Sequence, residues 1–157
     1  MSFLRPISIS LSPNTEKDDI WLAFKLLFQP WLLKSHGNSS REIEEEFKKY
    51  LNVKYAISFN SGRSAFLAIL NSLGLEKGSE VLLQTFTCNA VPNRIIWAGL
   101  KPVYVDCDEK TFNIDIEDLK RKITSNSRVV VIQHTFGLPA KIDEILEICR
   151  QNNLILI

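Results

Sequence analysis

A short polar run after an apolar segment is the first place in this sequence where chemistry is expected. The run Asn60-Ser61-Gly62-Arg63-Ser64 follows a predicted strand, Tyr55–Phe59, and leads into a predicted helix with apolar residues at helical spacing. A helix that begins here directs its unpaired N–H groups and positive dipole end outward, which suits an anion, typically phosphate. The dipole alone contributes only about 0.3–1 kcal/mol, so direct hydrogen bonds must supply most of any binding. An ordinary strand-to-helix turn with a polar cap also explains these residues.

Further polar side chains follow other apolar segments that are predicted to be strands. These groups are Thr85-Phe86-Thr87-Cys88, Asp106 with Asp108, and Gln133-His134. Because ligands of open parallel sheets bind beyond the carboxyl ends of the strands, these groups are a candidate pocket lining. The sequence contains neither GxGxxG nor GxxxxGK followed by Ser or Thr, which disfavours a dinucleotide and a nucleoside triphosphate. A cofactor with a single phosphate group is the remaining candidate ligand.

Some of these residues also have purely structural interpretations. Asp106, Asp108 and Asp115 resemble a metal-binding cluster, but turn and helix-capping roles account for aspartate at such positions, and we expect no metal. His134 either approaches the pocket or is a hydrogen-bonded structural histidine.

Composition limits the class of protein. The chain has 157 residues, 45% hydrophobic and 24% charged, with a net charge of +1, as expected for one soluble globular domain or part of one. No basic stripe indicates a nucleic-acid partner. Three cysteines without CxxC spacing indicate neither disulfides nor zinc and fit a reducing, cytoplasmic setting. The apolar segment Leu22–Leu33 is too short and too interrupted to span a membrane.

The elements that must position the polar residues alternate between strand and helix from Tyr55 onward. The five predicted strands are Tyr55–Phe59, Glu80–Gln84, Pro102–Val105, Arg128–Gln133 and Leu154–Ile157. The helices predicted between them are one opening at Ser61, a segment Cys88–Gly99 interrupted by Pro92, Ile116–Ile123 capped by Asp115, and Ala140–Asn152. Continuous apolar strands such as VVVI must be buried on both faces. The pattern therefore predicts an α/β fold, a mostly parallel sheet covered by helices in an α/β/α sandwich.

The sequence also predicts a division of the chain. Residues 1–38 are expected to form an arm and a helix whose apolar face includes Trp21, Phe24 and Phe28, as core or dimer contacts, and residues 39–157 the start of a large domain. The last strand stops in mid-pattern at Ile157, so we expect the natural protein to continue and to complete the sheet.

Several blocks resemble one known family. The blocks EEFKKYLNVKYAISFNSGRSAFLAIL, GSEVLLQTFTCNAVPNRIIWAGLKPVYVDCDEKTFNID and VVVIQHTFGLPAKIDEILEICRQNNLILI are similar in order and spacing to the DegT/DnrJ/EryC1/StrS family of pyridoxal-phosphate-dependent aminotransferases of fold type I. The resemblance covers about Ser39 to Ile157 and implies a transferase-like large domain. It implies a homodimer that aminates a keto sugar nucleotide, with an amino acid as donor.

The resemblance also implies cofactor contacts. The family's phosphate loop falls on Ser61, Gly62, Arg63 and Ser64, and the aromatic that stacks on the cofactor ring aligns with Cys88. The family usually has Thr where Arg63 stands, so a hydroxyl contact is lost and a cation is gained. Phe86 can take the place of the family's stacking aromatic only if the local backbone directs its ring toward the cofactor.

No catalytic residue is assigned within the chain. The family's Schiff-base lysine and the acid that pairs with the pyridinium nitrogen are expected beyond Ile157, and the 157 residues alone should not transaminate. Two alternatives remain open. One is a pyridoxal-phosphate sugar dehydratase on the same scaffold, with histidine in place of the lysine. The other is a non-catalytic binding or regulatory protein of the same fold.

Overall fold

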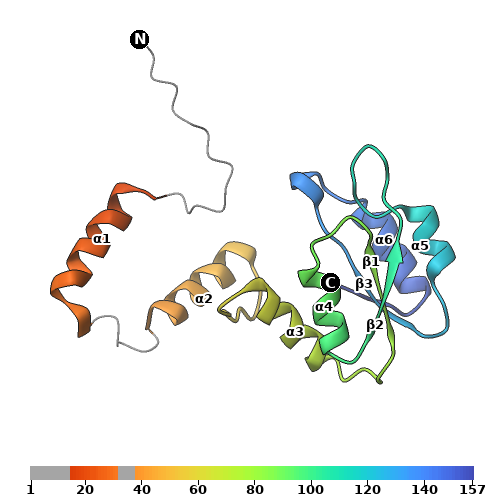
Figure 1. Ribbon diagram of the computed structural model, residues 1–157, viewed down its shortest axis with the longest axis horizontal. Helices are drawn as coiled ribbons and strands as arrows, with labels where there is room; N and C mark the ends of the chain where they lie inside the picture. Colours follow the sequence, from red (N-terminus) through yellow and green to blue (C-terminus); the bar gives the residue numbers. More distant parts are fainter. Residues whose placement is uncertain (1–14, 32–37) are drawn as a thin grey trace, which may run out of the picture. The chain divides into compact units, whose positions relative to one another are not determined.

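The computed structural model describes residues 15–31 and 38–157 and divides the chain into two units, residues 1–57 and 58–157. The first unit contains helices α1 (Lys17–Phe28) and α2 (Asn38–Leu51) (Figure 1). Helix α1 begins after Glu16, whose N–H donates to the Asp19 carboxylate at 2.9 Å. From its sequence, either Asn14 or Thr15 could cap this helix; Thr15 lies one residue before Glu16, and Asn14 lies outside the described residues. No residue of α1 is buried.

The second unit carries a parallel sheet with alternating helices (Figure 1). Its elements are α3 (Gly62–Ser72), β1 (Glu80–Gln84), α4 (Ala90–Trp97), β2 (Lys101–Val105), α5 (Ile116–Lys122), β3 (Ser127–Val131), the 3-10 turn η2 (Thr135–Gly137), α6 (Ile142–Gln151) and β4 (Ile155–Leu156). The four strands are ordered β2-β1-β3-β4, and every neighbouring pair is parallel.

Two apolar layers hold the sheet, one on each face. Every residue of β1 is buried, and its side chains alternate between the layers as the two-residue period of a strand requires. Leu82 packs with residues of α5 and α6, whereas Val81 and Leu83 pack with residues of α3 and α4. Complete burial of one such side chain stabilises the fold by about 1.5–3 kcal/mol. The predicted α/β/α sandwich is confirmed.

Two sequence predictions are wrong. Residues 55–59 form no strand, and none of the four described strands pairs with them, because alternating apolar residues create a strand only where a neighbouring backbone accepts its hydrogen bonds. Pro92 does not interrupt the helix after β1. It is the third residue of α4, in the first turn, where a missing N–H breaks no intrahelical hydrogen bond.

No helix in the described part of the chain combines the length and the apolar character needed to cross a bilayer.

Candidate functional site

The order of the strands creates a crevice between β1 and β3. From β1 the chain passes through α4 to β2 on one side, and then returns to place β3 and β4 on the other side of β1. At such a switch point the connections diverge to opposite faces, and the carboxyl ends of the two strands flank an opening. A cavity of about 610 Å³ lies there. Its lining comes from the residues that follow β1 and β3: Thr85, Phe86, Thr87, Cys88, Gln133, His134 and Thr135.

The start of α3 faces a second cavity, of about 270 Å³. Gly62 and Arg63 line it together with Gln133 and Ile157, which follow β3 and β4. Gln133 lines both cavities, so the N-terminus of α3 and the loop after β1 border a common crevice. No acidic side chain lines this second cavity within the described chain.

The first turn of α3 leaves two backbone N–H groups without an acceptor. Ser61 caps the helix: its Oγ accepts from the Ser64 N–H at 3.2 Å, and the two hydroxyl oxygens lie 3.0 Å apart. The Ser64 and Ala65 N–H groups also donate to the Ser61 carbonyl. Among the described residues, nothing accepts from the N–H groups of Gly62 and Arg63. These are the two donors that the sequence assigned to an anion.

The side chains of Arg63 and Cys88 lie on different parts of the crevice. Arg63 is exposed beside the second cavity, and its guanidinium forms no ion pair with a described residue. Cys88 is exposed and lines the first cavity. Phe86 lines the same cavity, while its ring packs 5.3 Å from that of Phe112. The structure thus brings Gly62 and Arg63 together and places Cys88 in the adjoining cavity.

His134 combines both of the roles considered for it. Its Nδ1 accepts a hydrogen bond from the Ala140 N–H at 3.1 Å. A nitrogen that accepts from an amide carries no proton, so in the neutral ring the proton is on Nε2. The residue also lines the first cavity. It is a hydrogen-bonded histidine at the edge of the pocket.

The carboxylates that resembled a metal cluster have local roles. Asp115 caps α5 by accepting from the Asp118 N–H at 2.7 Å. Asp108 accepts from the N–H and the hydroxyl of Thr111, and these hydrogen bonds hold the pKa of its carboxyl below the ordinary value. Asp106 and Asp108 line another, separate cavity. No group of three potential ligands fit for a metal ion occurs within residues 15–31 and 38–157.

Sequence analysis missed Gln84, which is only 1% exposed at the end of β1. Its Nε2 contacts three acceptors: the carbonyl of Phe86 at 3.0 Å, the carbonyl of Phe112 at 3.1 Å and the hydroxyl of Thr135 at 2.8 Å. One amide therefore ties together the loops that follow β1, β2 and β3. The only signal in the sequence was a polar residue closing the apolar strand EVLLQ.

The donors at the start of α3 fit a phosphate group. Gly62 and Arg63, whose N–H groups have no acceptor among the described residues, begin an 11-residue helix and line a cavity that has no acidic residue in its described lining. A phosphate accepts hydrogen bonds from backbone N–H groups and from a guanidinium, and each such hydrogen bond is charge-assisted. The fold and this geometry define an open-sheet α/β protein in which helix α3 begins beside the crevice at the carboxyl ends of the strands.

The protein family follows from comparison with known sequences. The model of the DegT/DnrJ/EryC1/StrS aminotransferase family matches residues 14–157, and the chain belongs to this family. GDP-perosamine synthase of Caulobacter vibrioides is 32% identical over 157 residues, which cover 100% of this chain and 42% of that protein. The spore coat polysaccharide biosynthesis protein SpsC of Bacillus subtilis is 32% identical over 142 residues, covering 90% of this chain and 36% of its own length.

Solved structures agree with this assignment. An aminotransferase from Psychrobacter cryohalolentis superimposes with a TM-score of 0.82 at 27% identity, over 94% of this chain and 37% of that one. An E. coli GDP-4-keto-6-deoxy-D-mannose-3-dehydratase with bound hydrated PLP superimposes with a TM-score of 0.80 at 27% identity, over 92% of this chain and 38% of that one. The chain spans between 34% and 42% of the length of the first two curated relatives.

Proposed function

We propose that the protein is a pyridoxal-phosphate-dependent aminotransferase that converts the keto group of a nucleotide-linked sugar to an amine, with an amino acid as donor. Family membership supports the cofactor and the reaction class. The names of relatives, which include aminotransferases for dTDP-linked and UDP-linked sugars, support the substrate class. The observation that carries the proposal is the pair of N–H groups of Gly62 and Arg63, which have no acceptor among the described residues and belong to residues that line the crevice.

Each residue of the crevice has a part in this proposal. The N–H groups of Gly62 and Arg63 hold the cofactor phosphate, and the Arg63 guanidinium adds a charge-assisted contact. The hydroxyls of Ser61 and Ser64 bond to each other and fix the turn that presents those amides. Cys88 lies against the cofactor ring without stacking on it as an aromatic would.

In this proposal, catalysis also needs groups that the family resemblance places outside residues 1–157. Bound pyridoxal phosphate would supply an electron-withdrawing ring that stabilises the carbanion formed when an amino group is transferred from the donor to the keto carbon. In the proposal, residues 39–157 are the first part of the large domain, and the active polypeptide includes a lysine and a ring-pairing acid outside them. The proposed assembly is a homodimer, as the resemblance implies, and the proposed location is the cytoplasm, which the cysteine pattern favours.

Two other functions remain testable. A dehydratase on the same scaffold is favoured by the likeness to the E. coli dehydratase, at a TM-score of 0.80. A binding protein without catalysis is favoured by Arg63 and Cys88, because both depart from the residues usual in the family at the proposed phosphate and ring positions.

Borohydride reduction followed by peptide mapping distinguishes these functions. The protein is expressed from its natural open reading frame, loaded with pyridoxal phosphate, reduced and digested. We expect a phosphopyridoxyl group on one lysine, together with amination of a keto sugar nucleotide. Cofactor binding without a lysine adduct, with histidine at the corresponding position, would identify the dehydratase. If no cofactor binds, the enzymatic proposal is wrong.

A further inference from the structure

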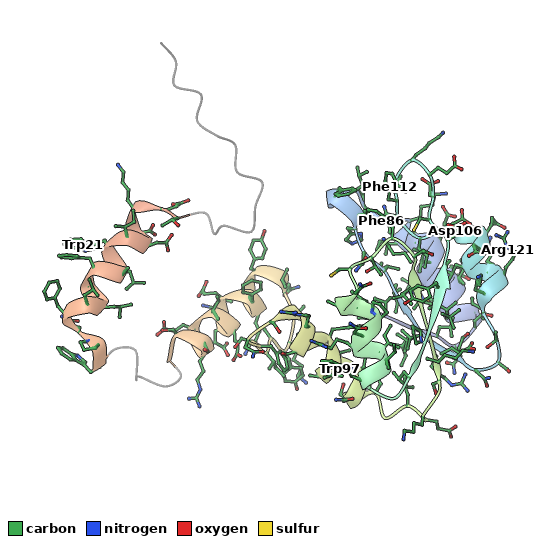
Figure 2. All side chains as sticks on the ribbon, viewed as in Figure 1. Trp21, Phe86, Trp97, Asp106, Phe112 and Arg121 are labelled. Atoms are coloured by element: carbon green, nitrogen blue, oxygen red, sulfur yellow. The ribbon has the colours of Figure 1, made fainter. Side chains whose placement is uncertain are left out.

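Three phenylalanine rings from three separate loops gather at the rim of the crevice. Phe86 follows β1, Phe112 lies between β2 and α5, and Phe136 lies in η2 after β3. The ring centroids are 5.3 Å, 5.8 Å and 6.3 Å apart, and the side chains are 47%, 43% and 79% exposed. Figure 2 shows Phe86 and Phe112 side by side at one end of this unit. We call these three residues the aromatic cluster.

Two members of the aromatic cluster have an unfavourable backbone conformation. Phe112 has φ of 56° and Phe136 has φ of 54°, in the left-handed region that bulky side chains rarely adopt. Such conformations cost free energy and persist only where surrounding contacts impose them. Strained residues of this kind concentrate at binding sites.

A buried polar network imposes this arrangement. Gln84 binds the backbone carbonyls of Phe86 and Phe112 and the hydroxyl of Thr135. The Thr135 hydroxyl also donates to the Phe112 carbonyl at 3.1 Å, and the Thr135 N–H donates to Asn113 Oδ1 at 2.9 Å. The three loops are therefore held together without a ligand, so a ligand that binds here pays little conformational entropy to order them.

We propose that the aromatic cluster binds the nucleobase of the substrate by stacking, an inference that rests on the proposed function. Phe86 belongs both to the aromatic cluster and to the lining of the larger cavity, so a ligand that extends out of the cavity meets the exposed rings. Relatives are named for GDP-, dTDP- and UDP-linked sugars, which carry three different bases. Stacking on aromatic rings tolerates such variety because every base has a flat π face.

The test compares ligands with and without a base. Calorimetry on the cofactor-loaded protein, expressed from its natural open reading frame, measures affinities for GDP, dTDP, UDP and inorganic pyrophosphate. Phe136→Asn removes the most exposed ring, and asparagine tolerates the left-handed backbone, so the loop keeps its course. Trp97→Ala is the matched control, because Trp97 is an exposed aromatic, 66% accessible, and lies at the opposite end of the unit from Phe86 and Phe112 (Figure 2).

We expect at least one nucleoside diphosphate to bind more tightly than pyrophosphate. Phe136→Asn should reduce this preference about tenfold, the order of effect of losing one base–aromatic stack, and Trp97→Ala should leave it unchanged. An unchanged preference in Phe136→Asn would overturn the inference. If the same variant instead converts a dimer into monomers during sedimentation, the aromatic cluster is an interface between copies of the chain.

Failure of the inference is distinguishable from failure of the proposed function. Uptake of pyridoxal phosphate, followed by its absorbance, reports on the proposed function and does not involve Phe136. Normal uptake with an unchanged base preference contradicts the stacking site alone. Absence of uptake contradicts the proposed function itself.

Discussion

The two ends of β1 carry buried polar residues with opposite surroundings. At the first residue, the Glu80 carboxylate accepts from Lys101 Nζ at 3.0 Å, Thr124 Oγ1 at 2.5 Å and Ser127 Oγ at 3.2 Å. At the last residue, the Gln84 amide ties three loops together through Nε2, but its buried Oε1 has no partner among the described residues. Both side chains are almost inaccessible, so burial alone does not distinguish them.

This difference between the two ends of β1 suggests that the Glu80 end stabilises the fold and that the Gln84 end serves binding. At the end with Glu80, both carboxylate oxygens accept hydrogen bonds, and Glu80 lines neither of the two crevice cavities. The end with Gln84 has an unmatched acceptor, two phenylalanines with positive φ and exposed rings. Open parallel sheets bind ligands at the carboxyl ends of their strands. Strained backbone and unpaired polar groups are common at such binding edges, where contacts with a ligand can offset their cost in free energy.

The largest effect is expected from Gln84→Leu. The substitution removes the amide donor that three loops share. Two buried carbonyls and one buried hydroxyl then lose this hydrogen-bond donor, so the unfolding free energy should fall by about 2–4 kcal/mol. Urea denaturation measures this loss. Gln84→Glu keeps the size and should also destabilise, because a carboxylate cannot donate to those acceptors. A wild-type midpoint in both variants would contradict the role given to the Gln84 amide.

Glu80→Gln should destabilise the fold but leave ligand binding intact. An amide keeps the shape but weakens the contacts with Lys101 and Thr124, so we expect a loss of about 1–3 kcal/mol in the same denaturation experiment. The affinity for pyridoxal phosphate should stay within twofold of the wild-type value. A larger change in affinity would mean that the two ends of β1 are not independent.

Stability should fall on acidification because the fold lowers the pKa of two carboxyl groups, that of Glu80 at the amino end of β1 and that of Asp118 in α5. Hydrogen bonds from the Thr124 hydroxyl and the Lys101 ammonium hold the pKa of Glu80 below its ordinary value, and the Asp106 N–H does the same for the pKa of Asp118. A carboxyl whose pKa is lower in the folded state stabilises the fold above the unfolded pKa, about 4, and this stabilisation disappears as pH falls through the folded pKa.

The pH series separates the contribution of Glu80 from that of other carboxyls. Unfolding free energies are measured between pH 7 and pH 3 for the wild-type protein and for Glu80→Gln. The wild-type protein should lose stability below about pH 4.5, and the variant should lose less over the same interval. Parallel curves for the two proteins would show that Glu80 has the same pKa in the folded and unfolded states.

The smallest effect is a gain in stability from Phe136→Asn. Asparagine adopts a positive φ more readily than phenylalanine, and the ring is 79% exposed, so relief of strain should outweigh the lost contacts by about 0.5–1 kcal/mol. Differential scanning calorimetry should show a higher melting temperature. A lower melting temperature would mean that the contacts of the Phe136 ring stabilise the folded protein by more than its positive φ costs.

Much of the sheet could be predicted from local pattern. The run EVLLQ predicted β1 with its observed bounds, and Asp115 was correctly expected to cap α5. In both cases the decisive information lies within a few residues: a continuous apolar run, and a carboxylate three positions before the N–H that it accepts from. The prediction of a strand at Tyr55–Phe59 failed because pairing depends on a partner that local sequence does not reveal.

The site was predictable only in part. The free N–H groups of Gly62 and Arg63 follow from a serine cap at the start of a helix, which is a local feature. The network around Gln84 joins residues 28 and 51 positions apart, so no pattern within one segment could indicate it. The cofactor-binding roles of Ser61, Gly62, Arg63, Ser64 and Cys88, and the division at residue 38, stay predictions.

We have proposed that the N–H groups at the start of α3 bind the cofactor phosphate. Gly62→Pro tests it most directly, because proline is favoured as the first residue of a helix, and Ser61 has the extended backbone, ψ of 154°, that must precede proline. The substitution therefore removes one N–H while preserving the helix. Gly62→Ala is the matched control, since an added Cβ meets no atom within 4 Å and the N–H is kept.

The measurement is the ratio of affinities for pyridoxal phosphate and pyridoxal, which lacks the phosphate. We predict that Gly62→Ala keeps the wild-type ratio and that Gly62→Pro lowers it about tenfold, as expected for the loss of one charge-assisted hydrogen bond. An unchanged ratio in a folded Gly62→Pro protein would show that the Gly62 N–H does not bind the phosphate.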